Sequence, residues 1–261
     1  MTDSVLFEID GAVATITLNR PAARNSLTAQ MKSALLEALG RCASDDGIRC
    51  VILTGAGQAF CAGQDLREHA ELLAEGAEPL RTVREHYNPI ILAIATLAKP
   101  VVAALPGVAA GAGASLAFAC DFRVAVRRAS LMMAFARVGL SADSGASWTL
   151  QRLVGSARAT ELLMLAEPVS AEQALRLGLL TKVVDDDDLA AQVRELAGRL
   201  AAGPTAAYGA IKESLLFAAG HGLADSLEKE ADLQVRLGDT ADHLAATAAF
   251  VNKEQPVFHG R

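Results

Sequence analysis

A long stretch near the middle of the chain, VVAALPGVAAGAGASLAFAC (101–120), contains no charged side chain. An uncharged segment of about 20 residues is buried either in a lipid bilayer or in the interior of a protein. Pro106 and the glycines at 107, 111 and 113 would interrupt a membrane helix, and the many alanines make the segment only weakly hydrophobic. We therefore predict a buried strand at VVAAL, a turn at PGVAAGAG and a buried helix at ASLAFAC, and no membrane span.

Strands and helices alternate on both sides of this stretch. VLFEID and VATITL are typical of a hairpin around Asp10-Gly11, while CVILTG and DFRVAV are typical of buried strands. Strands that alternate with helices form parallel sheets with crossover connections, so the predicted fold class is α/β. From about Asp185 apolar residues recur at helical spacing with no intervening strand, which predicts a core (1–184) followed by a helical region (185–261).

Three helices are predicted before the uncharged stretch, one of them a charged helix after AGQAFCAGQDL. The loop NRPAARNSL leads to Thr28, the expected N-cap of a helix whose Met31, Leu35 and Leu39 share one face. A third helix is expected from about Leu80 to Leu97, because the residue before Pro100 disfavours helical conformation.

Charge and cysteine usage argue against several classes of protein. The 261 residues carry a formal net charge of −6 and no Lys- or Arg-rich run, so no nucleic-acid or membrane partner is expected. The four cysteines show no C-x-x-C or zinc-like spacing and the five histidines are scattered singly, so we expect reduced thiols and no metal site. The opening MTDSVLFEID lacks the features of a signal peptide, which favours a cytoplasmic location.

Two loops rich in glycine and alanine each follow a strand and open a helix: CAGQDL after VILTG, and GVAAGAGAS after VVAAL. Such junctions expose backbone N–H groups at a helix N-terminus, and small residues let a ligand approach them. Two converging N–H groups would form an oxyanion hole that stabilises negative charge on a carbonyl oxygen. For either loop alone, tight packing of glycine-rich turns is the alternative. The sequence contains neither G-x-G-x-x-G nor a Walker A loop, which disfavours binding of nucleotide phosphates.

Together these segments carry a resemblance that runs in the same order along nearly the whole chain. VILTGAGQAFCAGQDL and KPVVAALPGVAAGAGASLAFACDFRVA resemble the two signature segments of the crotonase, or enoyl-CoA hydratase/isomerase, superfamily. NRPAARNSL resembles the coenzyme A loop of that family, and GLSADSGASWTLQRLVG, PVSAEQALRLGLLTKVV and AAFVNKEQPVFHGR continue the match. Within the family, YNPII, MAFARVGL and GSARATELLM resemble the isomerases that act on a ring epoxide of phenylacetyl-CoA.

The resemblance implies a crotonase-type spiral of strand–strand–helix (ββα) turns with a C-terminal helical region that forms a homotrimer or a hexamer. It also implies an acyl-CoA substrate and no permanently bound cofactor. The oxyanion donors would be the backbone N–H groups of Gln64 and Ala112, with Gly111 in the substrate pocket. Lys253 would contact coenzyme A phosphates, in some members from a neighbouring subunit. The other predicted coenzyme A contacts are Arg24, Asn25, Ser26, Leu27, Ala62, Gly63, Asp65 and Leu66.

The chain departs from the hydratases of the family at both of their glutamate positions, which hold Ser115 and Phe135. Neither side chain transfers a proton as a carboxylate does, so weak or no hydratase activity is expected. Both residues, together with Trp148, are assigned instead to the substrate pocket. Asp143 lies where several isomerases and the aromatic dehalogenases of the family carry a functional aspartate, and it is the predicted acid/base.

A single carboxylate suits an isomerase, because it removes a proton from the γ carbon and returns it to the α carbon while the oxyanion hole holds an enolate. Desolvation would raise the pKa of Asp143 and favour both transfers. The structural alternative for Asp143 is an N-cap of the helix in DSGASWTLQRL. The functional alternatives are a weak or broad hydratase, a dehalogenase or thioesterase with Asp143 as nucleophile, and a non-catalytic acyl-CoA-binding homologue.

Overall fold

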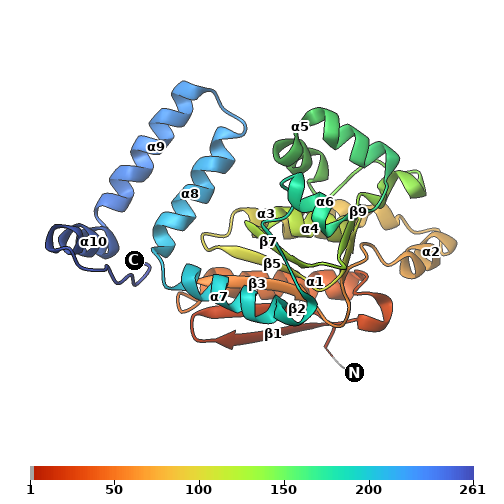
Figure 1. Ribbon diagram of the computed structural model, residues 1–261. Coiled ribbons are helices and arrows are strands. Elements are labelled where there is room, and N and C mark those ends of the chain that lie inside the picture. The colour runs from red at the N-terminus through yellow and green to blue at the C-terminus, as the bar shows by residue number, and fades with distance from the viewer. Residues whose placement is uncertain (1–2) are drawn as a thin grey trace.

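Two sheets surrounded by helices form the body of the protein in the computed structural model, which describes residues 3–261 (Figure 1). The larger sheet has the strand order β1-β2-β3-β5-β7-β10, and all its pairs are parallel except the β1–β2 hairpin. The predicted hairpin around Asp10-Gly11 is therefore confirmed. The strands of this sheet are β1 (Val5–Asp10), β2 (Val13–Leu18), β3 (Cys50–Gly55), β5 (Val101–Leu105), β7 (Phe122–Val126) and β10 (Lys182–Val184).

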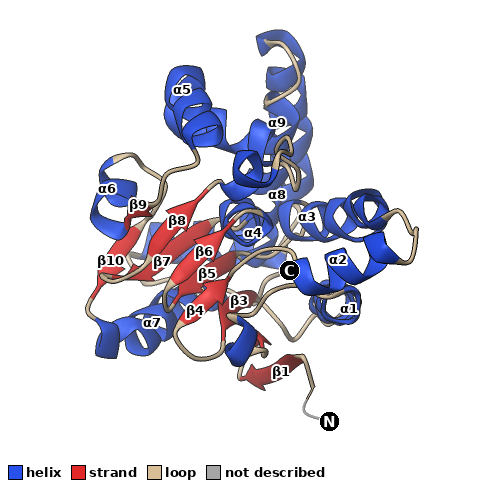
Figure 2. Cartoon of the chain, turned by 90° about the vertical axis from the view of Figure 1, so that its right-hand side faces the viewer, coloured by secondary structure: helices blue, strands red, loops and turns tan. Residues whose placement is uncertain are grey.

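The smaller sheet consists of short strands in the order β4-β6-β8-β9 (Figure 2). Each of β3, β5 and β7 is followed in the chain by one of these short strands and then by a helix, so the repeating unit is strand–strand–helix. This repetition confirms the predicted ββα spiral and α/β class. The short strands are β4 (Ala59–Cys61), β6 (Val108–Ala110), β8 (Ser130–Met132) and β9 (Val169–Ser170).

The uncharged stretch at 101–120 is divided among β5, β6 and a buried helix, α4 (Ala112–Ala119). Every residue of β5 is buried, as expected for a strand covered on both faces. The prediction of a simple turn at PGVAAGAG is wrong, because β6 lies within it and pairs with β4 and β8. Among residues 3–261 we find no helix with the length and apolar character needed to cross a bilayer.

The helices before this stretch follow the prediction in part. Thr28 caps α1, since its hydroxyl accepts a hydrogen bond from the backbone N–H of Met31. The continuous helix expected from about Leu80 is instead divided into three parts. These are a short 3-10 helix (η2), one turn of π-helix (η3) and the α-helix α3. Pro89 has no N–H for the preceding turn, so a regular α-helical ladder cannot run through this point. The bounds are α1 (Ala29–Ser44), α2 (Leu66–Ala74), η2 (Pro79–Arg81), η3 (Val83–Tyr87) and α3 (Asn88–Ala95).

The second half of the chain is mostly helical. One face of α7 belongs to the main core through Leu189, Val193, Ala197 and Ala201, whereas α8–α10 extend away from the sheets (Figure 1). The division at Asp185 and the assembly into trimers stay predictions. The helices are α5 (Ala146–Leu165, kinked at Gly155), α6 (Ala171–Arg176), α7 (Leu189–Ala201), α8 (Thr205–Ala218), α9 (Leu223–Gly238) and α10 (Ala241–Asn252).

Candidate active site

The two glycine-rich loops of the sequence meet at the start of α4. Gly63, in the loop after β4, has a φ of +90°, which only glycine adopts readily. A Cβ added to Gly63 would lie 2.8 Å from the carbonyl oxygen of Ala110 and 3.5 Å from the backbone nitrogen of Ala112. The loop that carries Gln64 therefore packs directly against the loop that carries Ala112.

The backbone of Gln64 is oriented by pairing with Leu27. Leu27 N–H donates to the carbonyl of Gly63 at 2.8 Å, and Asp65 N–H donates to the carbonyl of Leu27 at 3.1 Å. In a parallel bridge of this kind the flanking residues make the bonds, and the central residue directs its own N–H to the opposite side. The Gln64 N–H thus points away from Leu27, on the side where a pocket lies.

The N–H of Ala112 is free for a different reason, because it belongs to the first turn of α4. Gly111, with a φ of +51°, precedes the helix, and the first bond of the helix runs from Ser115 N–H to the Gly111 carbonyl. N–H groups before that bond have no acceptor within a helix. Within residues 3–261, neither the Gln64 N–H nor the Ala112 N–H donates to another backbone group outside a helix or strand. Two adjacent donors of this kind have the arrangement of an oxyanion hole.

A pocket of about 330 Å³ opens in front of these donors and is mainly apolar. In the described part of the chain, Asp143 is the one carboxylate that lines it. Its walls come from the loops after β4 and β6, from α2, from the segment 80–87 and from the segment 134–143. The lining residues are Ala62, Gly63, Gln64, Leu66, His69, Leu80, Thr82, Val83, Tyr87, Gly111, Ala112, Ala134, Phe135, Val138, Leu140 and Asp143.

Asp143 is not the N-cap of α5, so this alternative is wrong. Ser144 and Gly145 both have positive φ values, +53° and +72°, and Gly145 is the N-cap without a side-chain hydrogen bond. The carboxylate is thereby kept off the helix and accepts a 2.7 Å bond from the hydroxyl of Ser144. Burial raises the pKa of Asp143 above its usual range, opposed by that hydrogen bond and by the charge of Lys32. A carboxyl with a raised pKa is suited to both proton removal and proton return.

Two residues of the site have no counterpart among the sequence predictions: Tyr87, which lines the pocket, and Lys32, which lies behind its wall. Both side chains are 1% exposed. Tyr87 hydroxyl donates to the side-chain oxygen Oε1 of Gln64 at 2.6 Å, and Lys32 Nζ donates to the same oxygen at 3.0 Å. A signal for Lys32 was present, because a residue four after Thr28 and three before Leu35 lies on the apolar face of α1.

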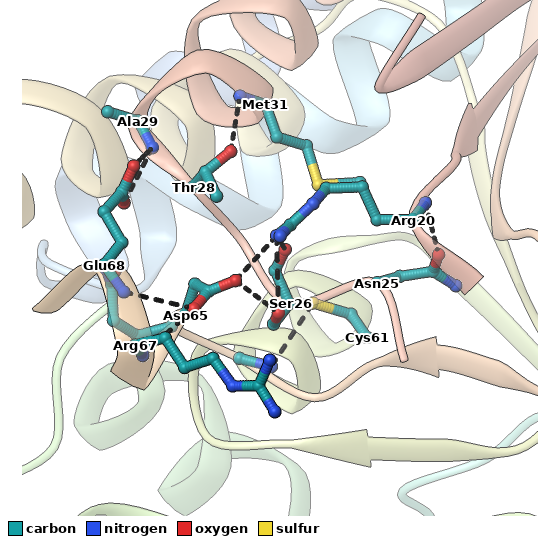
Figure 3. A network of polar contacts seen from close by, with 12 residues as sticks. Arg20, Asn25, Ser26, Thr28, Ala29, Met31, Cys61, Asp65, Arg67 and Glu68 are labelled. Carbon is teal, nitrogen blue, oxygen red and sulfur yellow. Dashed lines mark hydrogen bonds and ion pairs between the residues drawn. The ribbon is translucent and has the colours of Figure 1, made fainter. Parts of the chain in front are cut away.

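The segments predicted to bind coenzyme A lie side by side, joined by a bond from Ala62 N–H to the Arg24 carbonyl and by the pairing of Leu27. Figure 3 shows the polar network that holds them: Arg20 Nη1 and Ser26 Oγ both bond to Asp65 Oδ2, at 2.8 and 2.9 Å.

Burial limits how the predicted coenzyme A residues can contact a ligand. Asn25 and Leu27 are fully buried, and the Asn25 side chain donates to the carbonyls of Ala56 and Ala59. The Asp65 carboxylate caps α2 by accepting from Arg67 N–H and Glu68 N–H. Arg24 and Leu66 are the exposed side chains of the two segments, so a ligand here would meet them and the backbone.

Replacing Asp65 by Asn is expected to lower the free energy of unfolding by about 1–3 kcal/mol at neutral pH, because Arg20 loses a buried charged acceptor. Burial raises the pKa of Asp65, but bonds from Arg20, Ser26 and two backbone N–H groups outweigh it and lower the pKa below its ordinary value. A carboxylate with a lowered pKa stabilises the fold above its unfolded pKa, and that contribution is lost as the pH falls through the folded pKa. The difference in melting temperature between the two proteins should therefore be largest at neutral pH and should shrink as the pH falls below the ordinary pKa of an aspartate; a difference that does not change with pH would contradict this account.

Ser115, Trp148 and Lys253 lie outside the pocket. Ser115 is fully buried in α4 and its hydroxyl bonds to the Gly111 carbonyl at 3.2 Å. Trp148 is 40% exposed and lines a different cavity, where α5 faces α3, α4 and α8, with the Arg152 guanidinium 4.0 Å from its ring centroid. Their assignment to the substrate pocket is therefore corrected, whereas Phe135 lines it as predicted. Lys253 is exposed at the end of α10, on the opposite side of Figure 1 from α2.

Across residues 3–261 there is no group of three His, Cys, Asp or Glu side chains able to hold a metal ion. The four cysteines are buried and free. Burial raises the pKa of the thiols of Cys42, Cys50, Cys61 and Cys120, to between about 11 and about 12. Unreactive structural thiols of this kind are not candidates for nucleophilic chemistry.

Comparison with known proteins gives a consistent result. The family model described as Enoyl-CoA hydratase/isomerase matches residues 8–261. A 1,2-epoxyphenylacetyl-CoA isomerase of Escherichia coli K12 is 41% identical over 262 residues, which is 100% of both chains. A probable enoyl-CoA hydratase of Rhodobacter capsulatus is 42% identical over 258 residues, 99% of this chain and 98% of the relative. A solved structure from Mycobacterium abscessus with the same enoyl-CoA hydratase/isomerase description has a TM-score of 0.94 at 45% identity, covering 98% of this chain and all of the other.

Proposed function

Because the chain belongs to the enoyl-CoA hydratase/isomerase family, we propose that it is an isomerase that shifts a double bond or opens a ring epoxide in an acyl-CoA thioester. The observation that carries this proposal is a pocket lined by Gln64, Ala112 and Asp143, in which Asp143 is the one carboxylate among residues 3–261 and the Gln64 and Ala112 N–H groups donate to no backbone group outside a helix or strand. Enzymes of this family act on coenzyme A thioesters. The finer assignment draws on the isomerase named among the relatives and on the chemistry of this pocket.

In the proposed reaction Asp143, in its ionised form, removes a proton from the α carbon of a 3-enoyl thioester. The electron pair of that C–H bond forms a double bond to the carbonyl carbon, and the carbonyl π pair moves to the thioester oxygen, which becomes an enolate oxygen. Hydrogen bonds from the N–H groups of Gln64 and Ala112 stabilise this negative charge. Asp143, now protonated, delivers the proton to the γ carbon as the double bond moves to the α and β carbons, and its carboxylate is regenerated, so that no atom is gained or lost. The pocket walls exclude water because they are largely apolar.

The same pocket is poorly equipped for hydration. Adding water to a 2-enoyl thioester requires one group to activate water and another to protonate the α carbon. At the two positions that carry glutamates in hydratases of the family, this chain has Ser115, whose hydroxyl is bonded within α4, and Phe135, whose ring lines the pocket. Asp143 alone would have to serve both functions.

A ring epoxide of phenylacetyl-CoA is the substrate class that we favour, since the E. coli relative is named for it. Opening such an epoxide to an oxepin thioester conserves all atoms, and the accompanying proton shift needs one acid/base group. A simple 3-enoyl-CoA is the second candidate, and both reactions pass through an enolate.

The two N-terminal coenzyme A segments and Lys253 are proposed to bind the carrier, and α8–α10 are proposed to contact other copies of the chain. Large apolar side chains on these helices are exposed in the monomer: Leu215 is 69%, Leu223 77% and Phe250 84% exposed. Burial between subunits would remove this apolar surface from water, and it would allow Lys253 to approach a neighbouring pocket.

The test is a set of assays on the unmodified enzyme. We expect conversion of 3-enoyl-CoA to 2-enoyl-CoA, or of the ring epoxide to its oxepin, with little hydration of 2-enoyl-CoA. Hydration at a rate comparable with isomerisation would refute the proposal. Turnover in H₂¹⁸O distinguishes this isomerase from a dehalogenase or thioesterase in which Asp143 is the nucleophile. A nucleophilic Asp143 would acquire ¹⁸O in its carboxylate, whereas an Asp143 that only transfers a proton would not.

A further inference from the structure

Lys32 is a buried cation for which the fold alone gives little reason. Its side chain is 1% exposed, and no described carboxylate lies within ion-pair distance of its ammonium. Removing an ammonium from water without an opposite charge is unfavourable. A buried cation retained beside a pocket is therefore a candidate for a functional role.

The contacts of Lys32 all lead to the pocket wall. Its Nζ donates to Gln64 Oε1 at 3.0 Å and to Thr82 Oγ1, and it lies 4.9 Å from the centroid of the Tyr87 ring. Tyr87 hydroxyl donates to the same Gln64 oxygen at 2.6 Å. The Gln64 side chain is thus held by two donors, while its backbone is held from the other side by Leu27.

We propose that Lys32 is a positioning residue of this site: with Tyr87 it fixes Gln64 so that the Gln64 N–H stays directed at the thioester oxygen, and its positive charge favours the ionised form of Asp143. The inference rests on the proposed function, because it assigns Gln64 and Asp143 the roles described above. Tyr87 and Gln64, which both contact Lys32, line the same pocket as Asp143, so the ammonium lies one side chain away from that pocket.

Several other groups around Asp143 could influence its protonation. His69 of α2 and Tyr87 of η3 line the pocket, and Ser144 bonds to the carboxylate. Burial raises the pKa of Tyr87, so the phenol stays neutral.

Two more titratable groups are engaged elsewhere. Glu68 accepts a hydrogen bond from Ala29 N–H, and His86 contacts Thr82 through Nδ1 at 3.1 Å. Lys32 is therefore the charged group that lowers the pKa of Asp143 against the effect of burial. Burial lowers the pKa of Lys32 itself, and the charges of Glu68 and Asp143 oppose that shift.

Three variants separate the two effects of Lys32. Lys32→Met removes both the charge and the hydrogen bond to Gln64. Lys32→Gln removes the charge but keeps an N–H donor, and Tyr87→Phe removes a donor to Gln64 without changing the charge. Lys182→Met is the matched control, because Lys182 is an exposed lysine of β10 that bonds to Gln192.

We expect Lys32→Met to lower kcat by up to about 10²-fold, as displaced catalytic groups do. Asp143 must be ionised to act as base, so kcat/KM falls as the pH drops through its pKa. Loss of the nearby cation raises that pKa and should move this acid limb to higher pH by on the order of one unit. Lys32→Gln should show the same displacement with a smaller loss of kcat. Tyr87→Phe should lower kcat without displacing the limb, and Lys182→Met should do neither.

A titration of the ¹³C-labelled carboxyl of Asp143 by NMR, in wild type and in Lys32→Gln, needs no turnover. An upward displacement of the Asp143 pKa supports the inference even if the enzyme catalyses another reaction, so a failed isomerase assay would reject only the proposed function. Equal Asp143 pKa values in the two proteins, together with an unchanged kcat, would show that Lys32 is only structural and overturn the inference. Thermal melts establish that each variant is folded.

Discussion

Replacing Asp143 by Asn should lower kcat for isomerisation by about 10²–10⁴-fold, the usual contribution of a positioned acid/base group. Asparagine has nearly the same shape and can keep the contact with the Ser144 hydroxyl, but it accepts no proton at neutral pH. Binding of the thioester should change little, because the N–H groups of Gln64 and Ala112 belong to the backbone. Steady-state assays with 3-enoyl-CoA and with the ring epoxide would separate the effect on kcat from that on KM.

The pH dependence of kcat/KM in the wild-type enzyme gives a second test of the role of Asp143. Since burial raises the pKa of Asp143, the acid limb of kcat/KM should lie above the usual range for an aspartate. Asp225→Asn, an exposed residue on α9, is the matched control and should leave both rate and limb unchanged. Full isomerase activity in Asp143→Asn would require a different acid/base group, and the titratable residues that line the pocket, His69 and Tyr87, would be examined next.

Sequence patterns predicted those parts of the site that depend on short segments of the chain, such as a helix cap or a glycine-rich junction. Thr28 caps its helix, and two glycine-rich junctions after buried strands bring Gln64 and Ala112 together. In such junctions small residues are required wherever backbones touch, so their pattern reports directly on a close approach. The roles of Gln64, Ala112 and Asp143 came from the family resemblance, because composition and periodicity alone left tight packing and helix capping open.

The features that were missed depend on contacts between distant segments. Tyr87 is the last residue of a short π-helix, which places its hydroxyl against Gln64, and helical periodicity does not predict such an element. Trp148 was assigned to the wrong pocket although the pattern held a warning: Ala146 and Leu150 are buried four residues apart, so the residue midway between them lies on the opposite face of α5. β6 was taken as a turn because three small apolar residues carry no periodic signal, and only pairing with β4 and β8 makes them a strand.

Gly63→Ala is expected to disrupt the oxyanion hole. The added Cβ would lie 2.8 Å from the Ala110 carbonyl oxygen, a backbone atom that cannot move aside alone, and alanine also disfavours a φ of +90°. Either the loop that carries Gln64 or the strand β6 must shift, and the two N–H donors then no longer converge. We expect kcat to fall by about 10²–10³-fold, as when one oxyanion donor is lost, with a stability loss of about 1–3 kcal/mol from backbone strain.

Gly11→Ala separates strain from misplacement of the donors. Gly11 also has a positive φ, +57°, but a Cβ there would meet no atom within 4 Å, and it lies in the β1–β2 turn away from the pocket. Its substitution should cost about 1–2 kcal/mol of stability from the left-handed backbone and leave kcat unchanged. Comparison of thermal melts and isomerase kinetics for the two variants isolates the effect on the donors. If Gly63→Ala lost only as much stability as Gly11→Ala and kept full activity, the Gln64 and Ala112 N–H groups would not be the groups that hold the enolate.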